Sequence, residues 1–341
     1  MERDFEKSLC LSTGIIFAFL SLSISLPNAI ILIALYRNPL RCFRKPFVVY
    51  LVFIVAMDLL VGTIVCPGEA VMRFLCAFGD EEIPKDGDIV KILGYIGVNS
   101  SILLVTAMSV DRFISVVVPY FYLKRVTPRK FVVCNTIIIC FSSIFAALQL
   151  AGISMDVYIL IDIHLHTTSP LVITTLSYFG MFLFLRKRAR VHLQRQTLDL
   201  PGNPTLQDMR RLNITRKERK FATTSFLILI FLIISLIPYF VSILIDTNCY
   251  DCRGQKWLSA LQESSVTFLF VNSLVNPLLT TFRINELKQS VLTIFWRMHE
   301  NSPRCLGDFE LQSDLRHQAN MKTRSAEGKS FEEERGVGIK S

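Results

Sequence analysis

Charged residues are missing from long stretches of this chain. Lys, Arg, Asp and Glu make up 19% of its 341 residues, whereas apolar residues make up 51%. A water-soluble domain usually carries more charge, spread along its whole length. The composition therefore excludes an ordinary soluble domain and favours a protein whose solvent is the lipid bilayer.

Motifs of hydrolytic enzymes are also missing. No His-Glu-x-x-His or Gly-x-Ser-x-Gly pattern occurs. No pair of carboxylates within an apolar stretch flanks a place for a catalytic water. These absences argue against an enzyme.

Seven apolar windows are long enough to cross a membrane as helices. A hydrocarbon core of about 30 Å requires about 20 residues per helix. The windows are 8–36, 47–72, 92–110, 131–155, 167–185, 221–245 and 264–282. Strands of a membrane barrel are shorter and alternate polar and apolar residues, which these windows do not. We therefore expect an all-α membrane protein, a seven-transmembrane helix bundle.

A single apolar window has two other interpretations, a buried core helix or a cleavable signal sequence. The first window is too long for a signal sequence and has Pro27-Asn28 near its middle instead of a small-residue cleavage site. We expect an N-terminal segment 1–10, a seven-transmembrane domain 11–282, a cytoplasmic amphipathic helix 283–298 and a disordered tail 299–341.

Basic residues gather in alternate connections. Four lie in 37–45 and four in 124–130, without any acid, and eleven lie in 186–220 beside three acids. The other connections are acidic or neutral, with five acids in 80–88 and with Asp156 and Asp162 after the fourth window. Because cytoplasmic loops carry the excess of Lys and Arg, the N-terminus is expected outside the cell and the C-terminus inside. The net charge of +9 then reflects topology and anionic membrane lipids rather than nucleic acid.

Asp58 is a carboxylate in the middle of the second window, with no Lys or Arg within several turns. A charge at that depth is costly and needs a polar or cationic partner. Oxygen-bearing side chains at similar depth are Ser101, Asn272, Ser273 and Asn276. This set suits a small hard cation. The alternative is a protonated Asp58 in a purely structural hydrogen-bond network.

Six features recur in order along the windows: Asn28, Asp58, Asp111-Arg112-Phe113, Pro170 with Tyr178, Pro238, and Asn276-Pro277. Their order and spacing resemble the rhodopsin-like (class A) G-protein-coupled receptors. Each feature alone is weakly specific, but the set in these windows is typical of that family. The resemblance implies a plasma-membrane receptor that binds an extracellular ligand and activates heterotrimeric G proteins, with an allosteric sodium ion at Asp58.

The resemblance assigns the G-protein coupling end to Asp111, Arg112 and Phe113. Arg112 is expected to pair with Asp111, or with Glu218 at the start of the sixth helix. The desolvation cost of a half-buried pair is close to its Coulomb gain, so such a pair adds little stability but biases two helix arrangements. The alternative is an exposed pair worth less than about 1 kcal/mol.

Prolines interrupt four different windows at Pro67, Pro170, Pro238 and Pro277. Proline inside a helix removes a backbone hydrogen bond and kinks the helix. We expect the sixth helix to swing outward about Pro238 and open a cleft for a G-protein helix. The alternative is a kink without motion.

Three positions depart from the family pattern. Leu236 replaces a Trp of the sixth helix, Thr280 the Tyr of the Asn-Pro-x-x-Tyr motif, and Phe113 the Tyr of the Asp-Arg-Tyr triplet. Thr280 is too short to make the water-bridged contact with Tyr178 expected of the active family state. Coupling is therefore expected to be constitutive, weak or differently triggered.

The cysteines depart as well. None of the nine lies in 80–91 or 152–168, so the bridge that the family usually makes from the third helix to the second outer loop is absent. Cys249 and Cys252 lie in the last outer loop, where oxidation is favoured, and we predict a local disulfide; zinc is a weaker alternative. Cys305 follows the amphipathic segment and is either palmitoylated or a free thiol.

The ligand is constrained mainly by exclusions. Gly94 stands where amine receptors of the family keep an Asp, which argues against a biogenic amine as the ligand. The seventh window has no Lys, which excludes a retinal Schiff base at its usual place. Two acids, Glu69 and Asp162, are expected near the mouth of the ligand cavity and suggest a cationic small molecule or peptide, unless they are solvated loop ends. The other residues expected to line it are Tyr95, Asn99, Tyr239, Phe240 and Phe270. The missing third-helix cysteine, the short second outer loop and the paired cysteines of the last loop look like the melanocortin, lysolipid and adenosine branch, although Pro170 and Gly94 fit it poorly.

Two further expectations complete the prediction. The polar tail carries Ser and Thr residues that phosphorylation would prepare for arrestin binding, and the amphipathic helix is expected on membrane lipids. A seven-span transporter or channel without G-protein coupling is the alternative function, although no inverted repeat is evident and the polar residues do not form pore-lining faces.

Overall fold

The described part of the chain consists of helices joined by short turns and loops. A computed structural model describes residues 2–37, 48–79, 87–198, 230–231, 233–283 and 285–296. The helices that contribute to the spans are α1 (Glu2–Arg37), α2 (Val48–Leu60), α3 (Cys66–Phe78), α4 (Gly87–Val117), α6 (Pro128–Ala147), α7 (Met155–Asp162), α8 (Ser169–Leu198) and α10 (Lys256–Arg283). The other helices are α5 (Pro119–Arg125), α11 (Asn285–Trp296) and Ile233–Asn248. No strand occurs in these ranges, in agreement with the all-α prediction.

Five described helical segments are long and apolar enough to cross a membrane. They are α1, α2 continued by α3, α4, α6 and its extension to residue 151, and α7 continued by α8. With the helix Ile233–Asn248 and α10, they form the seven-helix bundle. Apolar side chains on the outer faces, such as Ile144 and Leu176, are more than half exposed, whereas Asn28 and Asp58 are fully buried. An apolar surface around a polar interior is the pattern expected of helices in lipid.

Two helices begin earlier than predicted. α1 begins at Glu2, so residues 2–10 form its first turns and not a separate segment. The fifth span begins with α7 at Met155, after a turn in which Gly152 has a φ of 75°. Asp156 and Asp162 therefore lie in a helix, and their placement in an outer loop was wrong. The two acids interrupt the apolar run, which is why hydropathy alone put the start of this helix too late.

Two π-helical turns accommodate prolines. Proline lacks the amide hydrogen that an α-helix needs at each position. In η1 (Val61–Val65), just before Pro67, the amide of Cys66 donates to the carbonyl of Val61. In η3 (Ile163–Thr168), just before Pro170, the amide of Ser169 donates to the carbonyl of His164. Each turn holds one extra residue, so both spans continue as helices and the residues before the proline are rotated about the helix axis.

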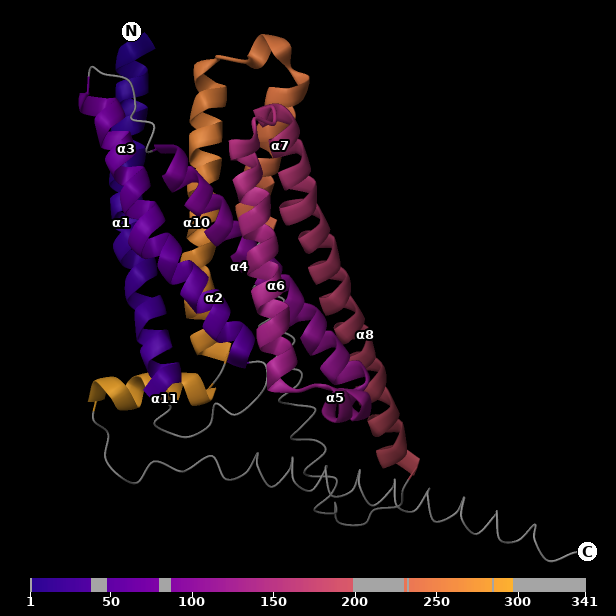
Figure 1. The fold of residues 1–341 in the computed structure, drawn as a ribbon. Coiled ribbons are helices and arrows are strands. Elements are labelled where there is room, and N and C mark those ends of the chain that lie inside the picture. Colours follow the sequence, from indigo (N-terminus) through magenta and orange to yellow (C-terminus); the bar gives the residue numbers. More distant parts are fainter. Residues whose placement is uncertain are drawn as a thin grey trace, which may run out of the picture.

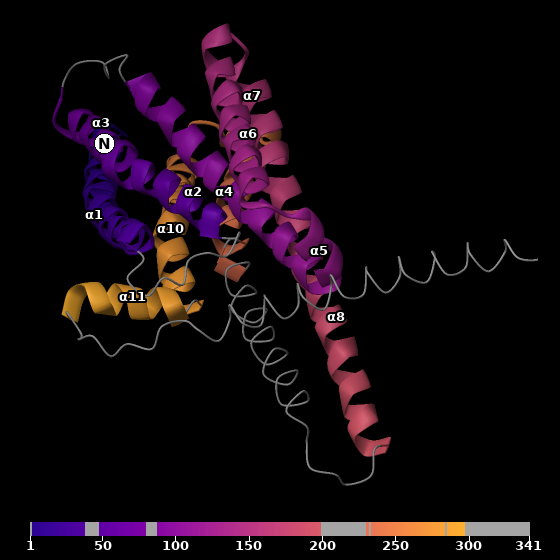
Figure 2. The ribbon, with the colours of Figure 1, turned by 60° about the horizontal axis from the view of Figure 1, so that its bottom comes forward.

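α4 runs through the bundle and contacts α2, α3, α6, α8 and α10. In Figure 2 it lies between α2 and α6. We name the two ends of the bundle by residues: the Cys10 end, where α1 begins, and the Arg112 end, where α4 meets α5 (Figure 1). α11 lies across the Arg112 end, and its fully buried Leu287 packs with Ile31 and Leu35 of α1.

Candidate functional site

A cavity of about 230 Å³ lies toward the Cys10 end of the bundle. One wall is a stripe of α4, because Lys91, Tyr95, Asn99 and Ile102 recur at spacings of three and four residues and so share one helix face. At a rise of about 1.5 Å per residue, Asn99 lies about 12 Å deeper along α4 than Lys91. α3, α7, η3, the helix Ile233–Asn248 and α10 close the other sides.

Asp162 forms the deep polar part of this cavity and is 3% exposed. Nδ2 of Asn99 donates a hydrogen bond of 2.7 Å to its Oδ1 atom. Nδ1 of His166 lies 3.0 Å from the same oxygen, but neither nitrogen of His166 makes a hydrogen bond with the described residues. The imidazole is fully buried, with its ring centroid 4.9 Å from that of Phe145. The rotation in η3 allows both Asp162 and His166 to face inward.

Aromatic rings surround the carboxylate. Tyr95 and Tyr239 line the cavity together with Asp162. The ring of Tyr95 meets that of Tyr158 edge to face, with centroids 5.4 Å apart. The deep part of the cavity thus combines one carboxylate, one amide and aromatic faces.

Arg73 organises the rim of the cavity. Its guanidinium pairs directly with Glu263 of α10 and lies 3.7 Å from Glu69. It also lies over the ring of Phe17 in α1, 5.7 Å from the centroid. These contacts connect α1, α3 and α10 at one level.

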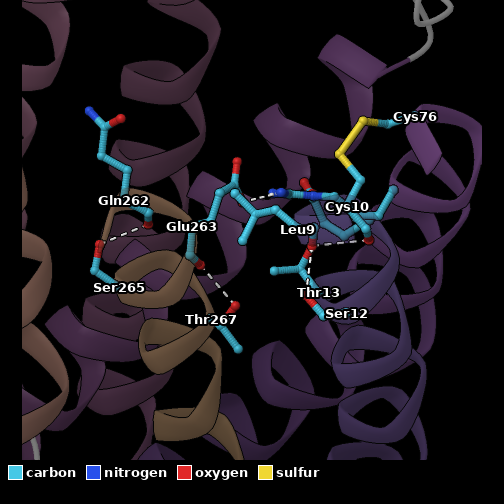
Figure 3. Close-up of polar contacts among 11 residues, drawn as sticks. Leu9, Cys10, Ser12, Thr13, Cys76, Gln262, Glu263, Ser265 and Thr267 are labelled. Carbon is cyan, nitrogen blue, oxygen red and sulfur yellow. Dashed lines mark hydrogen bonds and ion pairs between the residues drawn. A yellow bond between two sulfur atoms is a disulfide. The ribbon is translucent and has the colours of Figure 1, made fainter. Parts of the chain in front are cut away.

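A disulfide joins Cys10 to Cys76 at the same end (Figure 3). The two Cα atoms are 6.0 Å apart, and the bond ties α1 to the last turn of α3. A second disulfide joins Cys249 to Cys252, the pair whose spacing predicts one. The Cys10–Cys76 disulfide was not predicted from the sequence, because 66 residues separate the two cysteines and no local pattern connects them.

Most of the predicted ligand residues meet at the cavity. Glu69, Tyr95, Asn99, Asp162, Tyr239 and Phe270 line it. Two details differ from the prediction. Phe240 does not line the cavity, because the residue next to Tyr239 points about 100° away around the helix. Asp162 lies deep, at the level of Asn99, and not near the mouth.

Asp58 sits in a separate polar cage near the middle of the bundle. It is fully buried. Ser101 donates to its Oδ1 atom at 2.9 Å, Asn276 donates to its Oδ2 atom at 3.0 Å, and Ser273 is a further partner. Asn272, also predicted for this set, is buried in α10 one residue before Ser273. Carboxylate and hydroxyl oxygens are thus concentrated in one buried place.

Asp111 and Tyr122 both bind Arg112 at the other end of the bundle. Its Nε atom donates to Oδ2 of Asp111 at 2.9 Å, and the Nη2 atom reaches the same oxygen. Nη2 also donates to the hydroxyl of Tyr122 in α5 at 3.0 Å. Burial raises the pKa of Tyr122 above its usual range, so this phenol stays neutral. Glu218, the alternative partner, lies outside the described residues.

Phe113 and Tyr178 brace α4 against α8 next to Arg112. The hydroxyls of Tyr178 and Ser109 are hydrogen-bonded at 2.8 Å. The ring of Phe113 packs on Gly180, where a β-carbon would lie only 2.7 Å away. The side chain of Thr280 and all of Cys305 lie outside the described part of the chain.

Comparisons with known proteins agree with this arrangement. A family model described as the 7 transmembrane receptor (rhodopsin family) matches residues 27–158 and 153–279, which together make up more than half of the chain. The chain belongs to this family of receptors. The crystal structure of squid rhodopsin matches 85% of the receptor and 86% of its own chain with a TM-score of 0.68 and 14% identity. At that identity the likeness shows a shared fold. The family consists of receptors and not of enzymes, in agreement with the prediction that the chain is no enzyme.

Proposed function

We propose that the receptor binds an extracellular small molecule or peptide in the cavity near Cys10 and activates heterotrimeric G proteins at its Arg112 end. The observation that carries the proposal is that Arg112 is bound by the carboxylate of Asp111 and by the hydroxyl of Tyr122. Both partners of the ion pair are mostly buried, with Arg112 14% and Asp111 7% exposed. Such a pair contributes little net stability, so a small free-energy change is enough to release Arg112 toward a G protein.

A packed route leads from the cavity toward the sixth span. Ile102 lines the cavity and packs against the buried Leu236. Leu236 lies two residues before Pro238, where the helix Ile233–Asn248 lacks one backbone hydrogen bond. A ligand that displaces Ile102 thereby shifts Leu236, and the proline provides the hinge. This apolar contact takes the place of the aromatic residue usual in the family.

The proposal also covers the membrane, the orientation and the further partners of the receptor. It is a multi-pass membrane protein, which we place in the plasma membrane with its N-terminus outside, as the distribution of Lys and Arg indicates. The carboxylate of Asp58 and the hydroxyls of Ser101 and Ser273 fit a sodium ion, which would neutralise the buried charge. We also propose that arrestin binds the tail and that lipids contact α11.

The test compares basal G-protein activation by the wild type and by Asp111→Asn in cells, at matched surface expression. Removal of the charge weakens the hold on Arg112, so we expect basal activation to rise several-fold. Asp111→Glu keeps the charge and serves as the control. Equal basal activation by all three proteins, or ion flux in liposomes without G-protein activation, contradicts the proposal.

A further inference from the structure

The rim of the cavity is electrically balanced. Arg73 lies between Glu69 and Glu263, and Lys91 at the mouth interacts with the charge of Glu69. Two acids and two bases therefore offset one another. A charged ligand group gains little at this level, because it has to displace one member of an existing pair.

Asp162 lacks such balance. No Lys or Arg of the described residues forms an ion pair with it, and Asn99 is neutral. Nδ1 of His166 lies 3.0 Å from Oδ1 of Asp162, but neither nitrogen of this imidazole makes a hydrogen bond within the described chain. Oδ1 accepts the bond from Asn99, while Oδ2 accepts none from the described residues. The carboxylate thus retains an open acceptor in the wall of the cavity.

We infer that the ligand carries a protonated amine and that the carboxylate of Asp162 binds its ammonium group. The inference rests on the proposed function, since it assumes that the ligand enters this cavity. A carboxylate that is 3% exposed gains more from a cation than one in water, because burial removes its solvation. Gly94 leaves the facing stripe of α4 without a carboxylate, so the cation is recognised from the fifth span instead of the third.

The surroundings of Asp162 define the ligand further. The rings of Tyr95 and Tyr239 offer π-faces to a cation, and their hydroxyl oxygens accept N–H bonds. Ile102 and Leu269 face the same space and suit an apolar body. A volume of about 230 Å³ is below the about 300–1,000 Å³ usual for drug-sized ligands. These features together select a small primary or secondary amine with an apolar or aromatic body.

The test measures the melting temperature of the full-length receptor in lipid nanodiscs with three probes of matched size. These are the cation 2-phenylethylamine, the neutral 2-phenylethanol and the anion 3-phenylpropionate, each at the same millimolar concentrations. The amine is expected to raise the melting temperature by roughly 2–4 °C, because it binds the folded state, and the other two are not. Equal shifts with the amine and the alcohol overturn the inference, as does the absence of a shift with the amine.

Two variants assign the effect to the residue. Asp162→Asn is expected to abolish the shift, whereas Asp156→Asn, an acid-to-amide change on the exposed face of α7, is expected to keep it. A full shift in Asp162→Asn overturns the inference. If that variant does not fold, the melting-temperature shifts of the wild type with the amine and with the alcohol still test the inference. No G protein is needed: a receptor that binds the amine without activating G proteins contradicts only the proposed function, and one that signals but ignores the amine contradicts only this inference.

Discussion

Ser109 of α4 and Tyr178 of α8 share a hydrogen bond of 2.8 Å between their hydroxyl groups. Ser109 also lies 2.8 Å from the carbonyl oxygen of Val105, to which its single proton can be donated. The Ser109 hydroxyl thus has two acceptors within reach, the Val105 carbonyl and the Tyr178 hydroxyl. Tyr178 is therefore tied to α4, and this bond depends on nothing at position 280.

The first prediction follows from a difference between the two residues: Ser109 has a second hydrogen-bond partner in the Val105 carbonyl. Ser109→Ala leaves the buried Tyr178 hydroxyl without its partner and should cost about 1–3 kcal/mol of folding stability. Tyr178→Phe leaves Ser109 with the Val105 carbonyl and should cost about 1 kcal/mol or less. Thermal unfolding of the two purified variants checks the order. A larger loss in Tyr178→Phe would show that Tyr178 has a second, more important partner.

The second prediction concerns the disulfide between Cys10 and Cys76. In a chain-entropy model, closing a separation of 66 residues stabilises the folded state by up to about 4 kcal/mol, and closing a separation of three by up to about 2 kcal/mol. The double variant Cys10→Ser/Cys76→Ser should therefore lose more thermal stability than Cys249→Ser/Cys252→Ser. Both double variants leave no unpaired thiol from the bridge that they remove. Equal melting temperatures for the two would mean that the long disulfide stabilises the fold no more than the short one.

The helix bundle was predictable because lipid demands long apolar runs, and such runs are visible in a single sequence. The cage around Asp58 was predictable for a related reason: a carboxylate in an apolar window needs polar partners, and few exist at its depth. Helix starts were less predictable. Asp156 and Asp162 look like loop residues, and only the packing of Asp162 against Asn99 shows that α7 carries it inward.

Contacts between distant helices were the part that sequence patterns could not supply. Arg73 and Glu263 lie near helix ends, where charged residues are usually solvated, and nothing in their spacing connects them. Tyr122 is equally inconspicuous in a basic loop, yet it binds Arg112. These partners depend on how the helices pack, which local periodicity does not encode.

A third prediction tests the contact of Phe113 with Gly180. A β-carbon at Gly180 would lie 2.7 Å from the ring of Phe113, so either this ring or one of the helices α4 and α8 has to move. Gly180→Ala should therefore destabilise the receptor by about 1–3 kcal/mol. Gly94→Ala is the matched control, because its β-carbon would meet the side chain of Val65 at 3.3 Å. Adding Phe113→Leu to Gly180→Ala should relieve the clash, because the leucine side chain is smaller. A Gly180→Ala variant with the same unfolding free energy as the Gly94→Ala control would disprove the clash.

The final prediction concerns the rim of the cavity. Arg73→Gln leaves Glu69 and Glu263 close together without the cation between them, so it should be the most destabilising single change at the rim. Adding Glu263→Gln removes one of the repelling charges and should restore part of the loss. A double-mutant cycle on unfolding should give a coupling of about 0.5–3 kcal/mol for Arg73 with Glu263. The same cycle for Arg73 with Glu69, 3.7 Å apart on one helix, should give about 0.5 kcal/mol or less. Strict additivity in the first cycle would show that the pair between α3 and α10 contributes nothing, and the balance of charge at the mouth would then rest on Lys91.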